Sequence, residues 1–482
     1  MRSKKENYGL GAQMMYGMGE FLNGGAFVII NTFFTVFLTN AIGLPAALAG
    51  TIPLVGKVWD AITDPIMGNI TDRTTSKIGP KRLYILIGAF ASSLTFILLW
   101  LPLHSDNQIL LYLFYILMYC LFSTGFTILM VPYNGLLPDM VEDYTIRSKF
   151  SNVRMIWSTL GSMVCGLVPT MIIKHQNIPD EYTSCAIIFG IIFLFTSLMT
   201  FAGTWEKQKP PVKVPMRDSF KSAVSVMKSR SFRIFIGIYL TGQCGMDFVS
   251  GMAVFYVTNV IGGTSENHYL TYLMGALIIS QLIGMLIWGP VMAATSKRTT
   301  VLIGAPIRII STLGLLFCSN ADGSIIPVII LAMGIGIGNA ATLTSIFAIL
   351  ADMADVDELI TGVSRPGIVS GMATFARKVS AGISAWLIGL LIDIVGYDGK
   401  LAIQTQATSE GIKYIFIFMP VILVAALFIF GYIFPMGKKE FDVIKKEVAR
   451  RKGEESSVTT EEEKKICEKV TGVAYNKLWG SN

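Results

Sequence analysis

The fold of this chain is constrained most by its apolar stretches, which charged and turn residues separate from one another. There are about twelve, and most approach the roughly 20 residues that a helix needs to cross a bilayer. Of the 482 residues, 52% are hydrophobic and only 15% are charged, whereas soluble domains carry about a quarter charged residues. Because a backbone in lipid must satisfy its own hydrogen bonds, the pattern predicts an all-α membrane protein. We expect spans near 16–40, 46–70, 83–103, 109–138, 151–173, 182–204, 232–261, 269–292, 300–319, 325–351, 367–395 and 413–435.

The distribution of Lys and Arg predicts how these spans are oriented. Basic residues gather in alternate connections and near both termini, and the positive-inside rule places such segments in the cytoplasm. We therefore expect a multi-pass protein of the cell membrane with both termini and the central linker cytoplasmic. Residues 1–8 lack the apolar region and cleavage site of a secretory signal, so the first span is expected to be retained. The net charge of +7 is explained by these loops and the tail, and we expect no nucleic-acid partner.

Three short motifs recur in the same order, about 213 to 219 positions apart. The sequence Thr39-Asn40 returns as Thr258-Asn259, Lys81-Arg82 returns as Lys297-Arg298, and Asp139-Met140 returns as Asp352-Met353. Transporter folds are often built from two similar halves, so the repeat predicts two pseudo-symmetric six-helix bundles. We expect an N-terminal half at 1–204, a linker at 205–231, a C-terminal half at 232–435 and a charged tail at 436–482. One chain would then hold both halves, and a monomer would suffice.

Two acidic residues, Asp60 and Asp64, lie one helical turn apart inside the second apolar stretch. An ionised carboxylate at bilayer depth costs roughly 2.5 to 3.5 kcal/mol, so the pair needs a cationic partner or a water-filled cavity. Lys57 lies one turn earlier on the same helix face. Two carboxylates against one ammonium leave a net negative charge, which predicts an exchangeable monovalent cation. The alternative is an internal salt bridge that only holds helices together.

The segment around these acids resembles a known family. Its most specific part is Trp59–Gly68, WDAITDPIMG, followed by Asp72-Arg73 and by GPKR at 79–82; VPYNGL at 131–136, EDYTIR at 142–147 and ADMAD at 351–355 add to it. With these motifs nearly the whole chain resembles the glycoside-pentoside-hexuronide:cation symporter family of the major facilitator superfamily, which includes the melibiose permease. The resemblance implies alternating access and symport of a sugar or glycoside with Na⁺, Li⁺ or H⁺. It implies no cofactor besides that ion.

The resemblance also implies a ligand set for the cation. Asp60 and Asp64 correspond to the family's cation carboxylates. Thr63 stands where relatives place Asn, and Thr127 matches a fourth-span hydroxyl of the same site. Neutral oxygen ligands of this kind suit a hard cation.

For the sugar, the resemblance points to Arg154 and Lys378 as basic residues of the cavity and to Asn23 at a position that is basic in the melibiose permease. A tryptophan that packs near the sugar in relatives has no counterpart here, where Tyr133 and Asn134 follow Pro132. Two aspartates that grip the sugar in the melibiose permease are replaced by Gly24 and Met130. Galactoside specificity therefore does not transfer, and a glucuronide, a pentoside or another small polar glycoside remains open.

Further charged residues lie inside predicted spans. Glu20, in the glycine-rich stretch 17–25, is expected to gate, to bind substrate or to pair with a basic residue such as Lys378. Asp247 serves either the cavity or a packing ion pair. Arg377 and Lys378 point about 100° apart, and the resemblance selects Lys378. Arg308 is expected near a membrane interface, where its side chain can snorkel. The predicted substrate-binding residues are Glu20, Asn23, Lys57, Tyr133, Asn134, Arg154, Asp247 and Lys378.

Charged residues in the connections resemble cytoplasmic gate elements of the superfamily, although a topological signal with surface ion pairs would explain each of them equally well. These candidate gating residues are Asp72, Arg73, Arg82, Asp139, Glu142 and Arg147. The tail has helical patterning at 441–451 and a capping-box-like sequence at 459–463. We expect it to be a solvated cytoplasmic helix, with regulation of the protein as the alternative.

Two other functions stay open beside symport. The missing sugar-gripping aspartates leave room for a lysolipid or other non-sugar transporter of the same fold. A non-transporting membrane sensor is the second alternative, and the cost of burying Asp60 and Asp64 argues against it. An enzyme is not expected, because the chain lacks a Ser/His/Asp set and a phosphate-binding loop, and the six cysteines have no metal-ligand spacing.

Overall fold

The regular structure of the chain is helical throughout its described part. The computed structural model describes residues 8–141, 144–206, 225–264, 266–318, 325–401 and 403–480. The first predicted span is composed of α1 (Leu10–Gly17), α2 (Gly19–Ile29) and two π-helical turns, η1 (Ile30–Phe34) and η2 (Phe37–Ala41). It is followed by α3 (Ala46–Arg73), α4 (Pro80–Leu99), α5 (Gln108–Met140), α6 (Tyr144–Ile172) and α7 (Pro179–Gly203).

The second half of the chain repeats this succession of helices. It contains η3 (Val226–Lys228), α9 (Arg230–Tyr256), the π-helical turn η4 (Val257–Ile261), α10 (Tyr269–Ala294), α11 (Lys297–Gly314), η5 (Leu315–Phe317), α12 (Ile326–Thr361), α13 (Pro366–Ile394) and α14 (Gln406–Ile433). The tail forms α15 (Lys438–Lys452), α16 (Glu461–Thr471) and η7 (Tyr475–Lys477). Local sequence sets several boundaries. The Asn107 side chain accepts hydrogen bonds from the N–H groups of Ile109 and Leu110 at the start of α5.

Ten of the helical segments in the described ranges are long and apolar enough to cross a membrane. They correspond to the third through the twelfth predicted spans. The first span is divided into short helices and π-helical turns, and α3 carries Lys57, Asp60 and Asp64 among its apolar residues. The all-α membrane architecture is confirmed, whereas the count of twelve spans is not confirmed in full.

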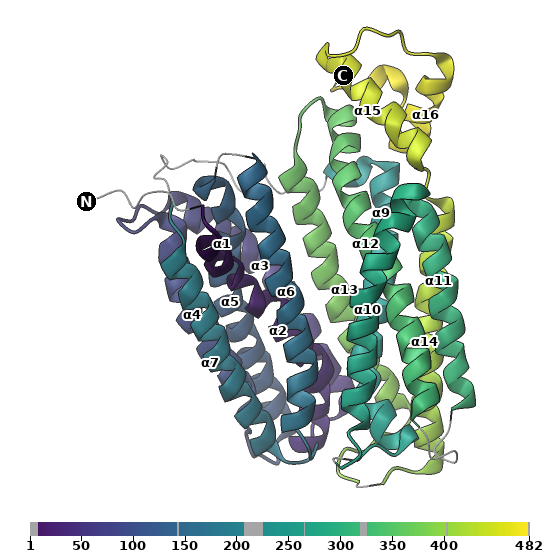
Figure 1. Cartoon of the computed structure of the whole chain (residues 1–482). Coiled ribbons are helices and arrows are strands. Elements are labelled where there is room, and N and C mark those ends of the chain that lie inside the picture. Colours follow the sequence, from purple (N-terminus) through teal and green to yellow (C-terminus); the bar gives the residue numbers. More distant parts are fainter. Residues whose placement is uncertain are drawn as a thin grey trace. The chain divides into compact units, whose positions relative to one another are not determined.

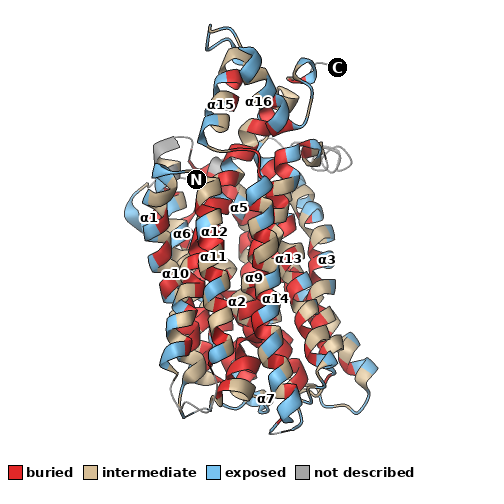
Figure 2. Cartoon of the chain, turned by 90° about the vertical axis from the view of Figure 1, so that its right-hand side faces the viewer, coloured by how far each residue is buried: buried red, intermediate tan, exposed pale blue. Residues whose placement is uncertain are grey.

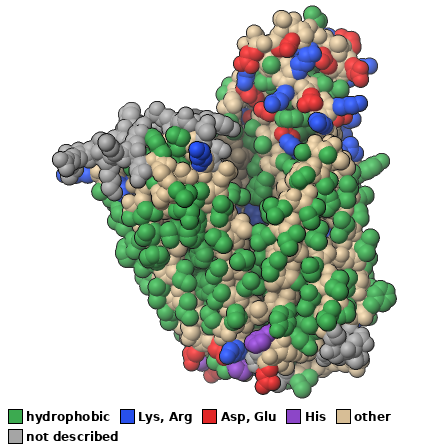
Figure 3. All heavy atoms as spheres, in the orientation of Figure 1, with side chains coloured by type: hydrophobic (Ala, Val, Ile, Leu, Met, Phe, Trp, Pro, Cys, Tyr) green, Lys and Arg blue, Asp and Glu red, His purple; other side chains and the backbone are tan. Residues whose placement is uncertain are grey.

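The outer surface of the helices is apolar in the way that a lipid environment requires. Leu286 in α10 is 79% exposed and Ile310 in α11 is 69% exposed. On the face shown in Figure 3, hydrophobic side chains cover the helices, and charged side chains gather over α15 and α16 and near helix ends. Such a continuous apolar surface is unfavourable in water and favourable in a bilayer.

The helices form two compact units. The first consists of Met1–Val214, Ser250–Gly275 and Ala385–Ile412, and the second of Pro215–Val249, Ala276–Ser384 and Lys413–Asn482. In the first unit, α4 packs along α5 and α7 (Figure 1). In the second, α11 packs along α12. The division at 204 and 232 that the repeat predicts stays a prediction.

The repeated Thr-Asn motif folds in the same way in both places. Phe37–Ala41 and Val257–Ile261 are π-helical turns, and each is followed by a glycine with positive φ, 81° at Gly43 and 73° at Gly262. Glycine adopts this backbone conformation without steric cost. The two turns belong to one polar network in the first unit. The Tyr397 hydroxyl donates to Asn40 (3.1 Å), Asn40 donates to Gln176 (3.2 Å), and Gln176 donates to Thr258 (2.5 Å).

The tail belongs to the second unit and packs against its other helices on one face, and the helix predicted at 441–451 is α15. Lys452 forms an ion pair with Glu358 (2.8 Å), and the N–H of Trp479 donates to the carbonyl of Leu359 (2.9 Å). Figure 2 shows buried positions within α15 and α16. The side chains of Ile444 and Cys467 are fully buried. The apolar side chains of each tail helix recur three or four residues apart, and one face of each helix is therefore buried.

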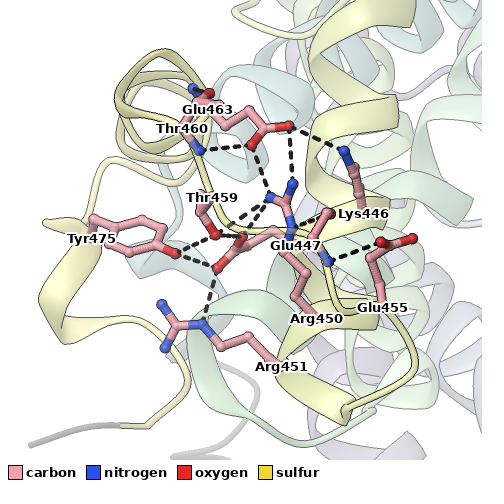
Figure 4. Close-up of polar contacts among 10 residues, drawn as sticks. Lys446, Glu447, Arg450, Arg451, Glu455, Thr459, Thr460, Glu463 and Tyr475 are labelled. Atoms are coloured by element: carbon pink, nitrogen blue, oxygen red, sulfur yellow. Dashed lines mark hydrogen bonds and ion pairs between the residues drawn. The ribbon is translucent and has the colours of Figure 1, made fainter.

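Glu447 is the centre of the polar contacts that join the tail helices (Figure 4). Its carboxylate accepts hydrogen bonds from Tyr475 Oη (2.5 Å), Arg451 Nε (3.0 Å) and Thr459 Oγ1 (2.8 Å). Although burial opposes ionisation, these hydrogen bonds hold the pKa of Glu447 below its usual value. On α16, hydrogen bonds from Arg450 and from the N–H of Thr460 lower the pKa of Glu463 to about 2.

Glu447→Gln is expected to loosen the tail by roughly 1.5 to 3 kcal/mol, the usual value of hydrogen bonds to a charged group. The measurement is hydrogen exchange of the α15 and α16 amides, which should become faster. Glu462→Gln, on the exposed side of α16, is the matched control and should leave exchange unchanged. Because the pKa values of Glu447 and Glu463 are lower in the folded tail, their stabilisation is complete above pH 4.5 and is lost as the pH falls toward 2. Amide exchange that responds neither to Glu447→Gln nor to the lower pH would contradict the hydrogen bonds to Glu447.

Candidate functional site

The predicted cation residues meet where α3 packs against α5. Lys57 Nζ lies 3.3 Å from Asp60 Oδ2, and the two side chains are 4% and 0% exposed. Asp64, one turn further along α3, accepts a hydrogen bond from Thr127 Oγ1 of α5 (2.8 Å). The Lys57 ammonium also lies 3.6 Å from the centre of the Phe27 ring. Lys57, Asp60, Asp64 and Thr127 are called the α3 charge group below, and its ionisable side chains sum to one negative charge.

Thr63 is directed elsewhere. Its hydroxyl donates to the carbonyl of Trp59 on its own helix (3.1 Å). Of the four predicted ligands, Asp60, Asp64 and Thr127 therefore belong to the α3 charge group, and Thr63 lies beside it. In the described residues no three His, Cys, Asp or Glu side chains come together to hold a metal ion. Two carboxylates with a hydroxyl are oxygen ligands of the kind that hard cations prefer.

Gly56 determines how closely α5 approaches the α3 charge group. A Cβ atom at Gly56 would lie 2.1 Å from the Tyr119 ring, and Tyr119 is fully buried. We expect Gly56→Ala to lower the free energy of unfolding by about 1 to 3 kcal/mol, because overpacking must displace a ring that has no room to move. Gly68→Ala, on the same helix, is the control, since its Cβ would meet only Val131 at 3.9 Å. Thermal unfolding of both variants measures the difference, and equal melting temperatures would refute it.

A second polar group in the first unit is centred on Glu20. Its carboxylate accepts hydrogen bonds from Asn23 Nδ2 (2.6 Å) and Arg154 Nε (2.9 Å). Arg154 Nη2 donates to Asn134 Oδ1 (2.5 Å), and its guanidinium lies 5.0 Å from the centre of the Tyr133 ring. Five predicted substrate residues thus form one cluster, called the Glu20 group below. The partner of Glu20 is Arg154 and not Lys378.

Two members of the predicted substrate set have other contacts. Lys57 pairs with Asp60 and belongs to the α3 charge group. The Tyr133 hydroxyl donates to the carbonyl of Tyr16 (3.0 Å), so it is already used within the protein. The face of this buried ring packs against the Arg154 guanidinium. Gly24, where the melibiose permease carries an aspartate, has no space for a side chain. Its Cβ would lie 2.3 Å from the carbonyl oxygen of Ser158.

The second unit contains a third polar group, formed by α9, α11 and α13. Arg377 holds Asp247 by two hydrogen bonds, of 2.5 and 2.8 Å. The sequence left the partner of Asp247 open, and the structure identifies it as Arg377. Lys378 is the half-buried neighbour of Arg377 on α13, and its role stays a prediction.

Arg308 is fully buried, so its expected place near a membrane interface was wrong. Its Nη1 donates to Asn339 Oδ1 (3.0 Å) and to the carbonyl of Gly242 (3.3 Å). The position of Arg308 in the sequence does not decide this burial. Arg308 lies eleven residues after Lys297, at which α11 begins, and six residues before Gly314, at which it ends. The burial depends on how α11 packs.

Asp139, one of the candidate gating residues, forms an ion pair that has an equivalent in the second half of the chain. Lys81 pairs with Asp139 and donates to the carbonyl of Gly135. Lys297 pairs with Asp352 (2.6 Å) and donates to the carbonyl of Ala348. In each case the carbonyl lies four residues before the aspartate. The equivalent sequence motifs of the two halves therefore make equivalent contacts.

The following arginines are also equivalent. Arg82 donates to the carbonyl of Phe201, and Arg298 donates to the carbonyls of Gly431 and Tyr432. Glu206 accepts hydrogen bonds from the N–H groups of Lys81 and Arg82, and burial raises its pKa.

Not all predicted gating residues meet at this contact. Arg147 instead donates to the carbonyl of Val141 (2.9 Å), and Arg73 is exposed at the end of α3. Glu142 and the side chain of Asp72 lie outside the described residues.

Comparison with known proteins agrees with this architecture. The model of the MFS/sugar transport protein family matches residues 15–438. An uncharacterized symporter of Bacillus subtilis (strain 168) is 26% identical over 88% of this chain and 92% of its own length. The glucuronide carrier protein homolog of Escherichia coli (strain K12) is 24% identical over 91% of this chain and 95% of its own length.

A solved structure shares the fold. The crystal structure of a bacterial homologue of the human lysosomal transporter Spinster, inward-facing and unoccupied, superposes with a TM-score of 0.64 and 13% identity. It covers 89% of this chain and 98% of that chain. These matches confirm the predicted family and exclude the enzyme alternative. The chain belongs to the MFS/sugar transport protein family and is a multi-pass membrane transporter.

Proposed function

We propose that this protein is a symporter that moves a sugar or glycoside together with a monovalent cation. The observation that carries the proposal is the α3 charge group. Two carboxylates, one ammonium and the Thr127 hydroxyl lie in an otherwise apolar helix pair. Carboxylate and hydroxyl oxygens are the ligands that a hard cation prefers, and carboxylates inside a membrane-spanning segment are typical of an ion pathway. The relative from Bacillus subtilis is called a symporter, which supports coupled transport of a substrate and a cation.

The Glu20 group is the sugar-binding part of this proposal. Sugars present hydroxyl groups that both donate and accept hydrogen bonds. The Glu20 group offers a carboxylate, a guanidinium and two amides, which match both roles. A substrate with a long acyl chain would need an apolar surface at this place, so the group favours a sugar over a lysolipid. The relative from Escherichia coli is called a glucuronide carrier protein homolog, and this name also favours a sugar derivative as the substrate.

The proposed topology follows from the basic loops. Both termini and the linker are cytoplasmic and the protein is in the cell membrane, because Lys and Arg gather in alternate connections, which the positive-inside rule assigns to the cytoplasm. The coupling ion is Na⁺, Li⁺ or H⁺. If it is H⁺, one carboxylate of the α3 charge group takes the proton, and if it is Na⁺ or Li⁺, the ion contacts both.

Uptake by proteoliposomes tests the proposal. Vesicles with the purified protein are given an inward gradient of Na⁺, Li⁺ or H⁺ in turn, and the accumulation of a panel of radiolabelled glycosides is followed. We expect at least one glycoside to accumulate in the presence of one of the gradients. The accumulated glycoside should leave the vesicles when an ionophore dissipates that gradient. Accumulation that is the same with and without every gradient would rule out symport.

A further inference from the structure

The third polar group carries more positive than negative charge. Among the described residues, the carboxylate whose charge acts on Arg308 of α11 is that of Asp247 on α9. That carboxylate already accepts two hydrogen bonds from Arg377 of α13. One aspartate therefore serves two arginines, and the three side chains sum to one positive charge.

The equivalent position in the first half of the chain is uncharged. The repeat relates Lys81 to Lys297 at a spacing of 216 positions (297 minus 81), and the same spacing relates Arg308 to Ser92 (308 minus 216). Ser92 is a fully buried residue of α4. The repeated architecture therefore does not by itself require an arginine here, and its charge needs an explanation within the second unit.

Tight helix packing encloses Arg308, whose side chain is 0% exposed. A Cβ atom at Gly338 of α12 would lie 2.9 Å from Arg308 Cβ, and a Cβ atom at Gly245 of α9 would lie 2.9 Å from Arg308 Nη2. Small residues of this kind allow neighbouring helices to approach each other closely. A ligand of the Arg308 guanidinium must therefore be small.

One edge of the Arg308 guanidinium has unused donors. Nη1 donates to Asn339 Oδ1 (3.0 Å) and to the carbonyl of Gly242 (3.3 Å). Nε and Nη2 have no hydrogen-bond partner among the described residues. The N–H of Nε and one N–H of Nη2 point in the same direction, and the rigid fork that they form binds an anion with two parallel hydrogen bonds. Because a buried donor without a partner is costly, we expect this edge to be occupied.

We propose that a small monovalent inorganic anion such as chloride binds to Arg308 Nε and Nη2 and is a resident part of the second unit. The anion brings the net charge of the third polar group to zero. A water molecule would satisfy the same donors and leave the buried charge unbalanced. The Arg377 side chain is 32% exposed, and charged side chains in membrane-spanning segments face a polar path or the interior, so an ion can reach the group. This anion is neither the sugar nor the cation of the proposed symport.

Thermal unfolding of the purified full-length protein in different sodium salts tests the proposal. Gluconate is replaced stepwise by chloride at constant Na⁺ concentration and ionic strength, so the contribution of the coupling cation stays the same. We expect the melting temperature to rise by about 2 °C or more and to saturate, as binding at one site requires. Bromide should act like chloride, whereas gluconate bears a carboxylate but is too large. Equal melting temperatures in the three salts would mean that water alone serves Arg308 and would overturn the proposal.

Variants with opposite changes in charge separate this site from a general effect of salt. Arg308→Gln removes the excess charge together with the binding edge, and the chloride-dependent shift should disappear. Asp247→Asn leaves both arginines without their carboxylate, so the shift should be complete at a lower chloride concentration. A higher chloride requirement in Asp247→Asn would contradict the proposal. Arg233→Gln, which changes an exposed arginine of α9, is the matched control and should keep the wild-type shift.

Arg377→Gln is the second variant if Arg308→Gln does not fold. It leaves Asp247 to Arg308 alone, and because this pair is neutral, the chloride-dependent shift should again be lost. A shift that persists undiminished in either arginine variant would place the anion elsewhere and overturn the proposal. None of these measurements requires transport, so a failure of the proposed symport would leave their results unchanged.

Discussion

Asp64→Asn is expected to reduce cation-driven accumulation of the substrate on the order of 100-fold, because the cation loses one of two carboxylates in a site of low dielectric constant. Asparagine has the same shape and still accepts the hydrogen bond from Thr127. Asp64 is half-buried, so the variant should fold. Exchange of labelled for unlabelled sugar across the membrane at equal cation concentrations needs no gradient and should survive.

The equivalent change at Asp60 is expected to affect the stability of the protein as well as transport. Asp60 is fully buried beside Lys57, and Asp60→Asn breaks this buried ion pair, at a cost of about 3 to 5 kcal/mol. We expect loss of accumulation together with a lower melting temperature. Asp106→Asn, in the exposed connection before α5, is the control for the loss of one negative charge. Full accumulation in both Asp60→Asn and Asp64→Asn would refute the cation site.

The sequence identified α3 because charge is rare inside apolar segments. Asp60 and Asp64 are conspicuous there, and their helical spacing was enough to predict that they share a face with Lys57. The repeat was also visible, since Lys81 and Lys297 occupy equivalent places and make equivalent contacts. Both predictions needed only local spacing, and neither required knowledge of how helices pack.

The choice between Arg377 and Lys378 needed the rotation of α13. Ser380 and Ser384 donate to the carbonyls of Leu240 and Cys244 on α9. Ser380 and Ser384 follow Arg377 by three and seven residues, so the same face of α13 carries all three toward α9. Small polar residues at this spacing mark a helix contact and could have identified Arg377 as the partner of Asp247. The π-helical turns had no comparable signal, because the motif Thr-Asn is compatible with an ordinary helix.

The Glu20 group and the third polar group differ in net charge. The Glu20 group is neutral as a pair, and its hydrogen bonds are already made in the absence of a ligand. A bound sugar must replace each of these hydrogen bonds by one of its own. The group can therefore recognise sugar hydroxyls, and the sugar needs no charge. The third polar group differs, because Asp247, Arg308 and Arg377 sum to one positive charge.

Breaking the Glu20 group should weaken sugar binding by about one to two orders of magnitude, because a hydrogen bond between a charged side chain and a sugar hydroxyl contributes about 1.5 to 3 kcal/mol. Glu20 and Arg154 are 7% and 23% exposed, so water replaces the lost partner only in part. Arg154→Gln and Glu20→Gln are each expected to lose affinity for the glycoside that gives the highest uptake. The variant with both changes should regain thermal stability and remain unable to bind, because the buried charge is gone while the sugar's partners are still missing.

Cation binding supplies the internal control for the same variants. The α3 charge group shares no described contact with Glu20 or Arg154, so stabilisation of the protein against heat by the coupling ion should be unchanged. Glu410→Gln, an exposed acid of the first unit, should leave both ligands unaffected. Equal loss of sugar and cation binding in Arg154→Gln would show that the two groups are one site. Undiminished sugar affinity in that variant would place the sugar elsewhere.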